Sequence, residues 1–231
     1  GRIVLNGRVL YDSEAGINLK PQQRKVGYLF QNYALFPNMT VAENIAFVSG
    51  GSRMEKQRRT AENLARFKLE ALAGAYPHEL SGGQQQRAAL ARILAADNEL
   101  LLLDEPFSAL DSYLKWQMEL ELTAVLQDYH GAALLVSHDR GEVYRLANRI
   151  AVINQGKMEA VHTKQGLFQS PDTLAATMLT GCKNVSTARR LAANRIFAED
   201  WQLELQVAGQ VPENLHYAAI RAHFMEVKPK M

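Results

Sequence analysis

Apolar and polar positions divide the chain into short strands and amphipathic helices. Near the start, apolar segments at residues 3–5 and 9–11 flank Asn6-Gly7, a dipeptide typical of two-residue hairpin turns. The pattern therefore predicts a pair of strands there, and it predicts a further strand at residues 26–30.

A mainly helical stretch follows, from about residue 40 to residue 96. Thr40 can cap its first helix, because the hydroxyl can accept from first-turn amides and Glu43 stands at the third helical position. Further on, apolar residues recur at helical spacing and predict a packed face: Ala61, Leu64, Ala65 and Leu69. The other face is basic and is expected to be solvated: Arg53, Lys56, Arg58, Arg59 and Arg66.

Strands and helices then alternate. Residues 100–103 form an apolar run too short for a buried helix, so they predict an interior strand of a parallel sheet. An amphipathic helix follows at about residues 114–129, and another strand at 132–136. This alternation indicates an α/β sheet, whose ligands bind at the carboxyl ends of its strands. Asp104 and His138 fall at two such ends.

Two segments of this framework carry chemistry. Ser81-Gly82-Gly83-Gln84 opens a helix with small residues, where a hydroxyl, open backbone amides and the helix dipole favour phosphate. Asp104 suits the water shell of magnesium, and Glu105 suits a base that orients or deprotonates water. Each segment also has a non-functional interpretation. Residues 81–84 could be a plain helix cap, and Asp104 and Glu105 could be two solvated acids at the end of a strand.

These residues resemble the ATPase subunits of ABC transporters in order and spacing, together with Ser108-Ala109-Leu110-Asp111 and Val136-Ser137-His138-Asp139. The likeness covers most of residues 1–170, and residues 27–37 resemble the glutamine loop of importer-type members. It implies an α/β, P-loop NTPase-like ATPase domain over residues 1–182, incomplete at its amino terminus. The helical subdomain of that domain would span about residues 40–96.

The resemblance implies roles for individual residues. Glu105 would be the catalytic base, and His138 would contact the γ-phosphate and steady the water. Gln31 would bridge magnesium and the water, and Asp104 would serve the metal. The resemblance also names residues that bind nucleotide or communicate between two subunits: Ser81, Gly82, Gly83, Gln84 and Asp111.

The implied cofactors are ATP and Mg²⁺. The implied partners are a second copy in a head-to-tail homodimer, transmembrane permease subunits and, indirectly, a substrate-binding protein. No apolar run approaches the roughly 18 residues of a membrane span and no signal segment opens the chain, so we expect any membrane association to go through a partner protein. The resemblance implies a peripheral place on the cytoplasmic face of the inner membrane.

Composition narrows the classes further. With 231 residues and 47% hydrophobic positions, the chain can bury a substantial core. A net charge of +2 supplies no broad field for a nucleic-acid backbone, so nucleic acid is not an expected partner. The single cysteine, Cys182, excludes an internal disulfide and fits a reducing compartment.

One motif of the family has no match in this sequence. None of the 15 glycines begins the phosphate-binding pattern Gly-x4-Gly-Lys-Ser/Thr, and the Gly156-Lys157 pair is followed by Met158. We therefore expect a segment that starts after the P-loop, and we expect this segment alone not to hydrolyse ATP.

The residues that follow Gln31 suggest a surface for the permease. Large apolar or aromatic side chains gather there within seven residues: Tyr33, Leu35, Phe36 and Met39. Such a cluster is either folded inward or presented as an anchor. We expect Leu35 and Phe36 to be partly buried and Tyr33 to be available to the permease.

The transported solute is the least determined property. Residues 31–41 are similar to those of bacterial importers for oxyanions, polyamines and sugars, and residues 104–115 and 180–184 look most like molybdate importer ATPases. Sulfate, polyamine and sugar importers stay open as alternatives. So do an ABC ATPase that moves no solute and a non-catalytic module that binds a partner's nucleotide through residues 81–84.

The carboxyl-terminal part reads as a separate unit. Short alternating segments at residues 195–198, 201–207 and 217–221 are separated by Gly209, Pro212 and Asn214. They predict the start of a small regulatory β domain over residues 183–231, incomplete at its end.

Overall fold

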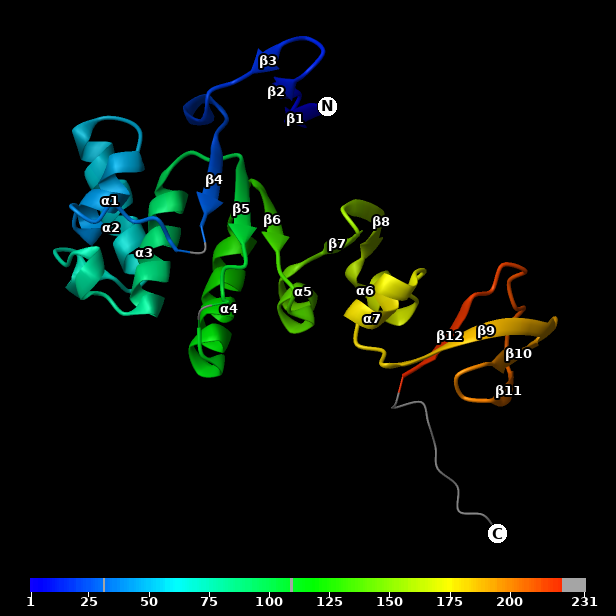
Figure 1. Cartoon of the computed structure of the whole chain (residues 1–231). Helices are drawn as coiled ribbons and strands as arrows, with labels where there is room; N and C mark the ends of the chain where they lie inside the picture. Colours follow the sequence, from blue (N-terminus) through cyan, green and yellow to red (C-terminus); the bar gives the residue numbers. More distant parts are fainter. Residues whose placement is uncertain (31, 109, 222–231) are drawn as a thin grey trace. The chain divides into compact units, whose positions relative to one another are not determined.

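The computed structural model describes residues 1–30, 32–108 and 110–221 of the chain (Figure 1). Gln31, which was assigned to magnesium and water, lies outside these ranges. Contacts divide the chain into two compact units, residues 1–142 and residues 143–231, and each is described by itself.

The first unit begins with a small antiparallel sheet in the order β1-β2-β3. Strands β1 (Arg2–Leu5) and β2 (Arg8–Asp12) form the predicted hairpin, and β3 (Ile17–Asn18) pairs with β2. Asn6 and Gly7 adopt φ values of 48° and 78°, as a type I′ turn requires. The predicted strand pair is confirmed, and a short 3₁₀ turn at Pro21–Gln23 leads on from it.

A parallel sheet of the first unit holds Asp104, which was predicted to serve a metal. Its order is β4-β5-β6, from β4 (Val26–Leu29), β5 (Leu100–Asp104) and β6 (Ala132–Val136). The central strand buries Leu101 and Leu103 on one face, whereas Leu100 and Leu102 on the other face are partly buried. Helix α4 (Ser112–Gln127) forms the crossover from β5 to β6. The predicted interior strand and parallel sheet are confirmed.

Three helices form the predicted helical segment on the β4 side of this sheet (Figure 1). They are α1 (Val41–Val48), α2 (Arg53–Arg66) and α3 (Gly82–Ala95), with 3₁₀ turns at Glu70–Leu72 and Pro77–Glu79 between the last two. Thr40 caps α1 in a capping box with Glu43, as predicted.

The packed face of α2 matches the predicted one only in part. Thr60 and Leu64 are buried, and Phe67, just past the end of the helix, continues this face, whereas Ala61 and Ala65 are exposed. The buried positions follow the i, i+4, i+7 spacing of a helix that packs against α1 and α3. Leu64 and Leu69 are buried, as predicted. The prediction is wrong for Ala61 and Ala65, because a small alanine occurs equally well on either face of a helix.

The second unit opens with a β hairpin and two short helices. Helix α5 (Arg140–Leu146) crosses the boundary between the units, and β7 (Arg149–Asn154) pairs with β8 (Lys157–Thr163). Val152, Leu167 and Ala176 form a small core with α6 (Lys164–Gln169) and α7 (Leu174–Leu179).

An antiparallel sheet completes the described part of the second unit, in the order β11-β10-β9-β12. The strands are β9 (Asn184–Ala192), β10 (Arg195–Ala198), β11 (Leu203–Gln206) and β12 (Tyr217–Ile220). The last three match the predicted strands, whereas β9 was not singled out from the sequence. The expected domain boundary at residue 183 falls just before β9 and stays a prediction, as does the regulatory role.

None of the helices in the described ranges is long and apolar enough to cross a membrane.

Candidate active site

Two neighbouring strands of the parallel sheet end in polar side chains. Asp104 is the last residue of β5, Glu105 follows it, and His138 comes two residues after the end of β6. The register pairs Asp104 with Val136, so the two strand ends lie side by side. The Tyr28 hydroxyl donates to Asp104 Oδ2 at 2.9 Å, and this hydrogen bond raises the pKa of Tyr28.

Glu105 turns the chain sharply where β5 ends. Its φ of 44° lies in the left-handed region, which costs a residue with a side chain about 1–3 kcal/mol. The turn is held by its backbone: the Glu105 N–H donates to Val136 O at 2.9 Å, and Ser108 donates to Glu105 O through N–H at 3.2 Å and Oγ at 3.1 Å. The surrounding bonds therefore hold Glu105 in a strained conformation at the end of β5.

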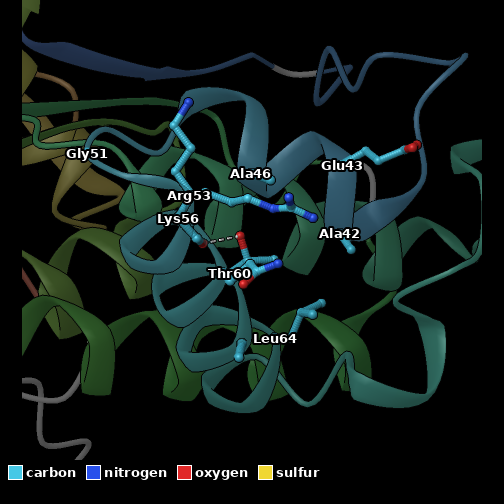
Figure 2. Close-up of a pocket in the computed structure, with 10 residues that line it drawn as sticks. Ala42, Glu43, Ala46, Gly51, Arg53, Lys56, Thr60 and Leu64 are labelled. Carbon is cyan, nitrogen blue, oxygen red and sulfur yellow. Dashed lines mark hydrogen bonds between the residues drawn. The ribbon is translucent and has the colours of Figure 1, made fainter.

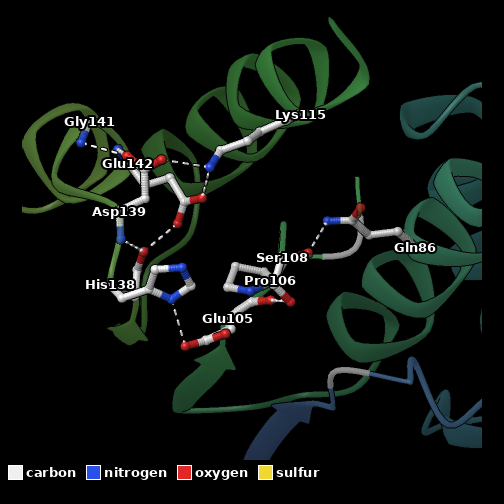
Figure 3. A network of polar contacts seen from close by, with 10 residues as sticks. Gln86, Glu105, Pro106, Ser108, Lys115, His138, Asp139, Gly141 and Glu142 are labelled. Carbon is white, nitrogen blue, oxygen red and sulfur yellow. Dashed lines mark hydrogen bonds and ion pairs between the residues drawn. The ribbon is translucent and has the colours of Figure 1, made fainter. Parts of the chain in front are cut away.

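The Glu105 carboxylate meets the imidazole of His138 (Figure 3). Glu105 Oε1 lies 2.8 Å from His138 Nδ1, and the His138 side chain is 76% exposed. The hydrogen bond to Glu105 and the charge of that carboxylate raise the pKa of His138. An accessible carboxylate beside an accessible imidazole can take a proton from a water molecule and offer one to an anion.

The backbone around His138 is held by its neighbours. Ser137 Oγ donates to Glu142 Oε2 at 2.5 Å and accepts from the Asp139 N–H at 3.0 Å. Lys115, from α4, places its ammonium 2.8 Å from Asp139 Oδ2 and 2.5 Å from Glu142 Oε1. The Lys115 ammonium holds the pKa of Asp139 down at about 2. Lys115 and Glu142 had no assigned role in the sequence analysis, because only the folded chain brings residues 115 and 142 together.

The small-residue segment opens α3 as a capping box. Ser81 Oγ accepts from the Gln84 N–H at 3.4 Å, and Gln84 Oε1 accepts from the Ser81 N–H at 2.8 Å. A side chain at Gly82 would meet nothing within 4 Å, whereas a Cβ at Gly83 would lie 2.9 Å from Leu114 on α4. Gly82 is thus open to an approaching anion, and Gly83 is small because two helices meet there.

Asp111 caps α4 and accepts from the N–H groups of Tyr113 and Leu114, both at 3.0 Å. The fold thus brings Asp104, Glu105 and His138 together at one sheet edge. It places the Ser81–Gln84 capping box and Asp111 at the starts of two adjoining helices.

The donor set fits magnesium in a limited way. Within the described ranges, no three or more histidine, cysteine or acidic side chains gather as a metal cluster. Magnesium commonly takes one or two carboxylates and completes its shell with water and phosphate oxygens. Asp104 can supply one such carboxylate at the end of β5.

Comparison with known proteins shows what the chain is similar to. Residues 1–108 match the family model described as "ABC transporter". The Fe(3+) ions import ATP-binding protein FbpC of Haemophilus influenzae (strain 86-028NP) is 41% identical over 197 residues, 84% of this chain and 56% of the relative. The sulfate/thiosulfate import ATP-binding protein CysA of Nitrosomonas europaea (strain ATCC 19718 / CIP 103999 / KCTC 2705 / NBRC 14298) is 35% identical over 232 residues, 96% of this chain and 63% of the relative.

A third relative is the spermidine/putrescine import ATP-binding protein PotA of Oleidesulfovibrio alaskensis (strain ATCC BAA-1058 / DSM 17464 / G20), 38% identical over 200 residues, 82% of this chain and 51% of the relative. The chain spans between 51% and 63% of the length of these three relatives.

The fold gives a matching result. A dimeric post-hydrolysis structure of the ATP-binding cassette MJ0796, bound to ADP and Pi, superposes with a TM-score of 0.58 at 28% identity, over 72% of this chain and 74% of the other. The matches in sequence and in fold place this chain in the family of ABC transporter ATP-binding domains.

Proposed function

We propose that this chain belongs to the ATP-hydrolysing subunit that energises an importer. The observation that carries the proposal is the contact of Glu105 with His138 at the carboxyl ends of β5 and β6, beside Asp104. Three groups with distinct chemistry, a metal-seeking carboxylate, a base and an imidazole, meet there at a position where α/β sheets bind ligands.

Glu105 is the base in this proposal. Its carboxylate takes a proton from the attacking water, a step that typically contributes about 10²- to 10⁴-fold. His138 carries the raised pKa, so it is protonated over a wider pH range than an ordinary histidine and can donate to a γ-phosphate oxygen. Asp104 orients the water shell of Mg²⁺, which when bound neutralises charge on the phosphates.

The α3 start serves a second copy of the chain. The first amides of a helix lack partners within the helix, and the helix dipole adds partial positive charge there. Gly82 is exposed and unobstructed, so a phosphate held by another subunit can approach its backbone. The structural neighbour MJ0796 is described as dimeric and bound to ADP and Pi, which supports a dimer. The head-to-tail arrangement, with Asp111 at the subunit contact, is part of this proposal.

A groove between α1 and α2 is the proposed binding site for the permease (Figure 2). It has a volume of about 720 Å³, with Ala42, Ala46, Ala61 and Leu64 among its lining residues. Arg53 and Lys56 lie on its α2 side. This combination fits a short amphipathic helix of a membrane partner that carries an acidic residue.

The solute is proposed from likeness alone. Molybdate is our expectation from residues 104–115 and 180–184, while the relatives described above are named for Fe(3+), sulfate/thiosulfate and spermidine/putrescine import. The residues of the site contact nucleotide and water in this scheme, not the solute. Docking on a permease places the protein at the cytoplasmic face of the inner membrane.

The test uses the full-length protein with its permease. Glu105→Gln keeps the shape of the side chain but removes the base, so ATP should still bind and bring two subunits together while turnover falls by about 10²-fold or more. Glu62→Gln, an exposed change on α2, is the matched control and should leave turnover unchanged. Near-normal turnover in Glu105→Gln would reject Glu105 as the base, and His138 would be the next candidate.

A further inference from the structure

Three consecutive glutamines of α3 make three different sets of contacts. Gln84 closes the capping box with Ser81. Gln85 Nε2 donates to the carbonyl of Pro77 at 2.9 Å. Gln86 is fully buried and points the other way: its Nε2 donates to Pro106 O at 2.8 Å, across to the end of β5 (Figure 3).

The acceptor of that bond belongs to the turn that presents Glu105. Pro106 follows Glu105 directly, and Phe107 is buried beneath the turn. The Glu105 backbone is bonded on one side to Val136 and on the other to Ser108. The Gln86 amide adds a bond from α3 to this strained turn, so the helix and the turn cannot shift independently without breaking it.

The Gln86 amide is poorly suited to a purely stabilising role. Its Oε1 is buried and has no hydrogen-bond partner in the described part of the chain. A buried amide with one unpaired end loses hydration that the single bond to Pro106 only partly restores. An unbranched apolar side chain of similar length would fill this space but leave the Pro106 carbonyl without its donor, so what the amide adds is a directed bond to the turn.

We propose that Gln86 is a positioning residue that holds the Glu105 turn in register with the α3 helix start. The inference rests on the proposed role of Glu105 as base, and it deepens that role. Movement of the Ser81–Gly83 segment against a bound phosphate is passed along the first turns of α3 to the Pro106 carbonyl, and so to the carboxylate that takes the proton.

Hydrogen exchange tests, without any assay of activity, whether Gln86 holds the Glu105 turn. In the full-length protein, Gln86→Met should speed exchange of the Glu105 and Ser108 amides by about tenfold or more, because the hydrogen bonds of these amides, to Val136 O and Glu105 O, hold the turn in place. Leu101 and Leu103, in the middle of β5, should exchange as before. Gln85→Met removes the same group from the adjacent position and should leave all four amides unchanged. Equal change at all four, or none at Glu105 and Ser108, would overturn the proposal.

Kinetics test the link to Glu105. With the permease present, Gln86→Met should lower kcat by about tenfold with an unchanged KM for ATP, while Gln117→Met on the exposed side of α4 should change neither. In the Glu105→Gln background, Gln86→Met should lower the residual rate by less than twofold, since both changes act on one step. A full tenfold loss in that background would overturn the proposal. Normal turnover of Glu105→Gln would reject the proposed base, yet the exchange result would stand.

Discussion

Glu105 Oε1 lies 2.8 Å from His138 Nδ1, although the two residues are separated by 33 positions in the chain. The parallel pairing of β5 with β6 produces this contact, because the register sets Asp104 opposite Val136 and both chains turn just beyond it. The contact raises the pKa of His138, because the Glu105 carboxylate favours the protonated imidazole.

The first prediction concerns the charge of His138. Glu105→Gln should lower the pKa of His138 toward its ordinary value near 6.5, because the carboxylate that raises it is gone. Nuclear magnetic resonance of the imidazole ring measures this directly as a function of pH. The control is Glu99→Gln, which alters a carboxylate directly before the first residue of β5 and should leave the pKa of His138 unchanged.

The raised pKa of His138 also determines how the free energy of unfolding should change with pH. A histidine whose pKa is raised on folding adds stability that is fully present below its unfolded pKa and is lost as pH rises through the folded pKa. Glu105→Gln should therefore lose this increment at about pH 6 and lose none of it at pH 9. A deficit that grows as the solution becomes more alkaline would contradict the assigned cause.

The second prediction concerns Lys115. Burial alone would lower the pKa of its ammonium, but hydrogen bonds to Asp139 and Glu142 outweigh this and raise it. Lys115→Met leaves the nearly buried Glu142 carboxylate without its cation, so the free energy of unfolding should fall by about 2–4 kcal/mol at pH 7. Arg66→Met, which breaks an exposed pair with Asp128, should cost under about 1 kcal/mol.

The loss of unfolding free energy in Lys115→Met should become smaller in acid. The pKa of Asp139 is lowered to about 2, so its contribution is present above its ordinary pKa of 3.8 and is lost as pH falls through about 2. Urea unfolding at pH 7, 4 and 2.5 should show the deficit of Lys115→Met shrinking toward the acid end. A deficit independent of pH would mean that packing of the lysine stem, not its charge, is what the variant loses.

The sequence predicted helices and strands well where the spacing of apolar residues and the polar residues at the boundaries indicate the same element. The apolar run at residues 100–103, its polar boundaries and Asp104 placed β5 and its carboxyl end correctly. It predicted contacts poorly where the partner is distant in the chain. Nothing near Gln86 indicates that its amide reaches Pro106, and nothing near Lys115 indicates two carboxylates.

The loop after Gln31 shows the same limit. Tyr33 was predicted to face a partner, but its side chain is 8% exposed, and that prediction is wrong. Arg92, a buried residue of α3, donates to the carbonyls of Tyr33 and Ala34 and draws the loop inward. Leu35 and Phe36 are partly buried, as predicted. The local sequence of an aromatic loop does not show whether the loop packs inward or faces a partner. Here the residue that holds it inward, Arg92, is 58 positions away from Ala34.

The third prediction moves the partner surface to the groove between α1 and α2. Ala61→Arg fills the groove without disturbing the fold, because Ala61 is exposed and arginine is a good helix former. With the permease, stimulated hydrolysis and solute uptake should fall by about tenfold, while basal hydrolysis stays within twofold. Ala65→Arg, on the same helix and outside the groove, should change neither. Equal loss in both variants would place the partner elsewhere.

The last prediction separates the two glycines of the α3 start. Gly83→Ala puts a methyl group 2.9 Å from the Leu114 side chain, which must shift from its packed position, and the free energy of unfolding should fall by about 1–3 kcal/mol. Gly82→Ala meets nothing and should leave unfolding unchanged or raise its free energy by about 0.4–1 kcal/mol.

Function should follow the opposite order. If a phosphate of a second subunit approaches the backbone at Gly82, a methyl group there obstructs it, so ATP-dependent dimerisation of the full-length protein should weaken by about tenfold in Gly82→Ala although the fold is intact. Analytical ultracentrifugation with ATP, in the Glu105→Gln background that prevents turnover, measures this. Undiminished dimerisation of Gly82→Ala would leave the capping box as the whole role of the segment.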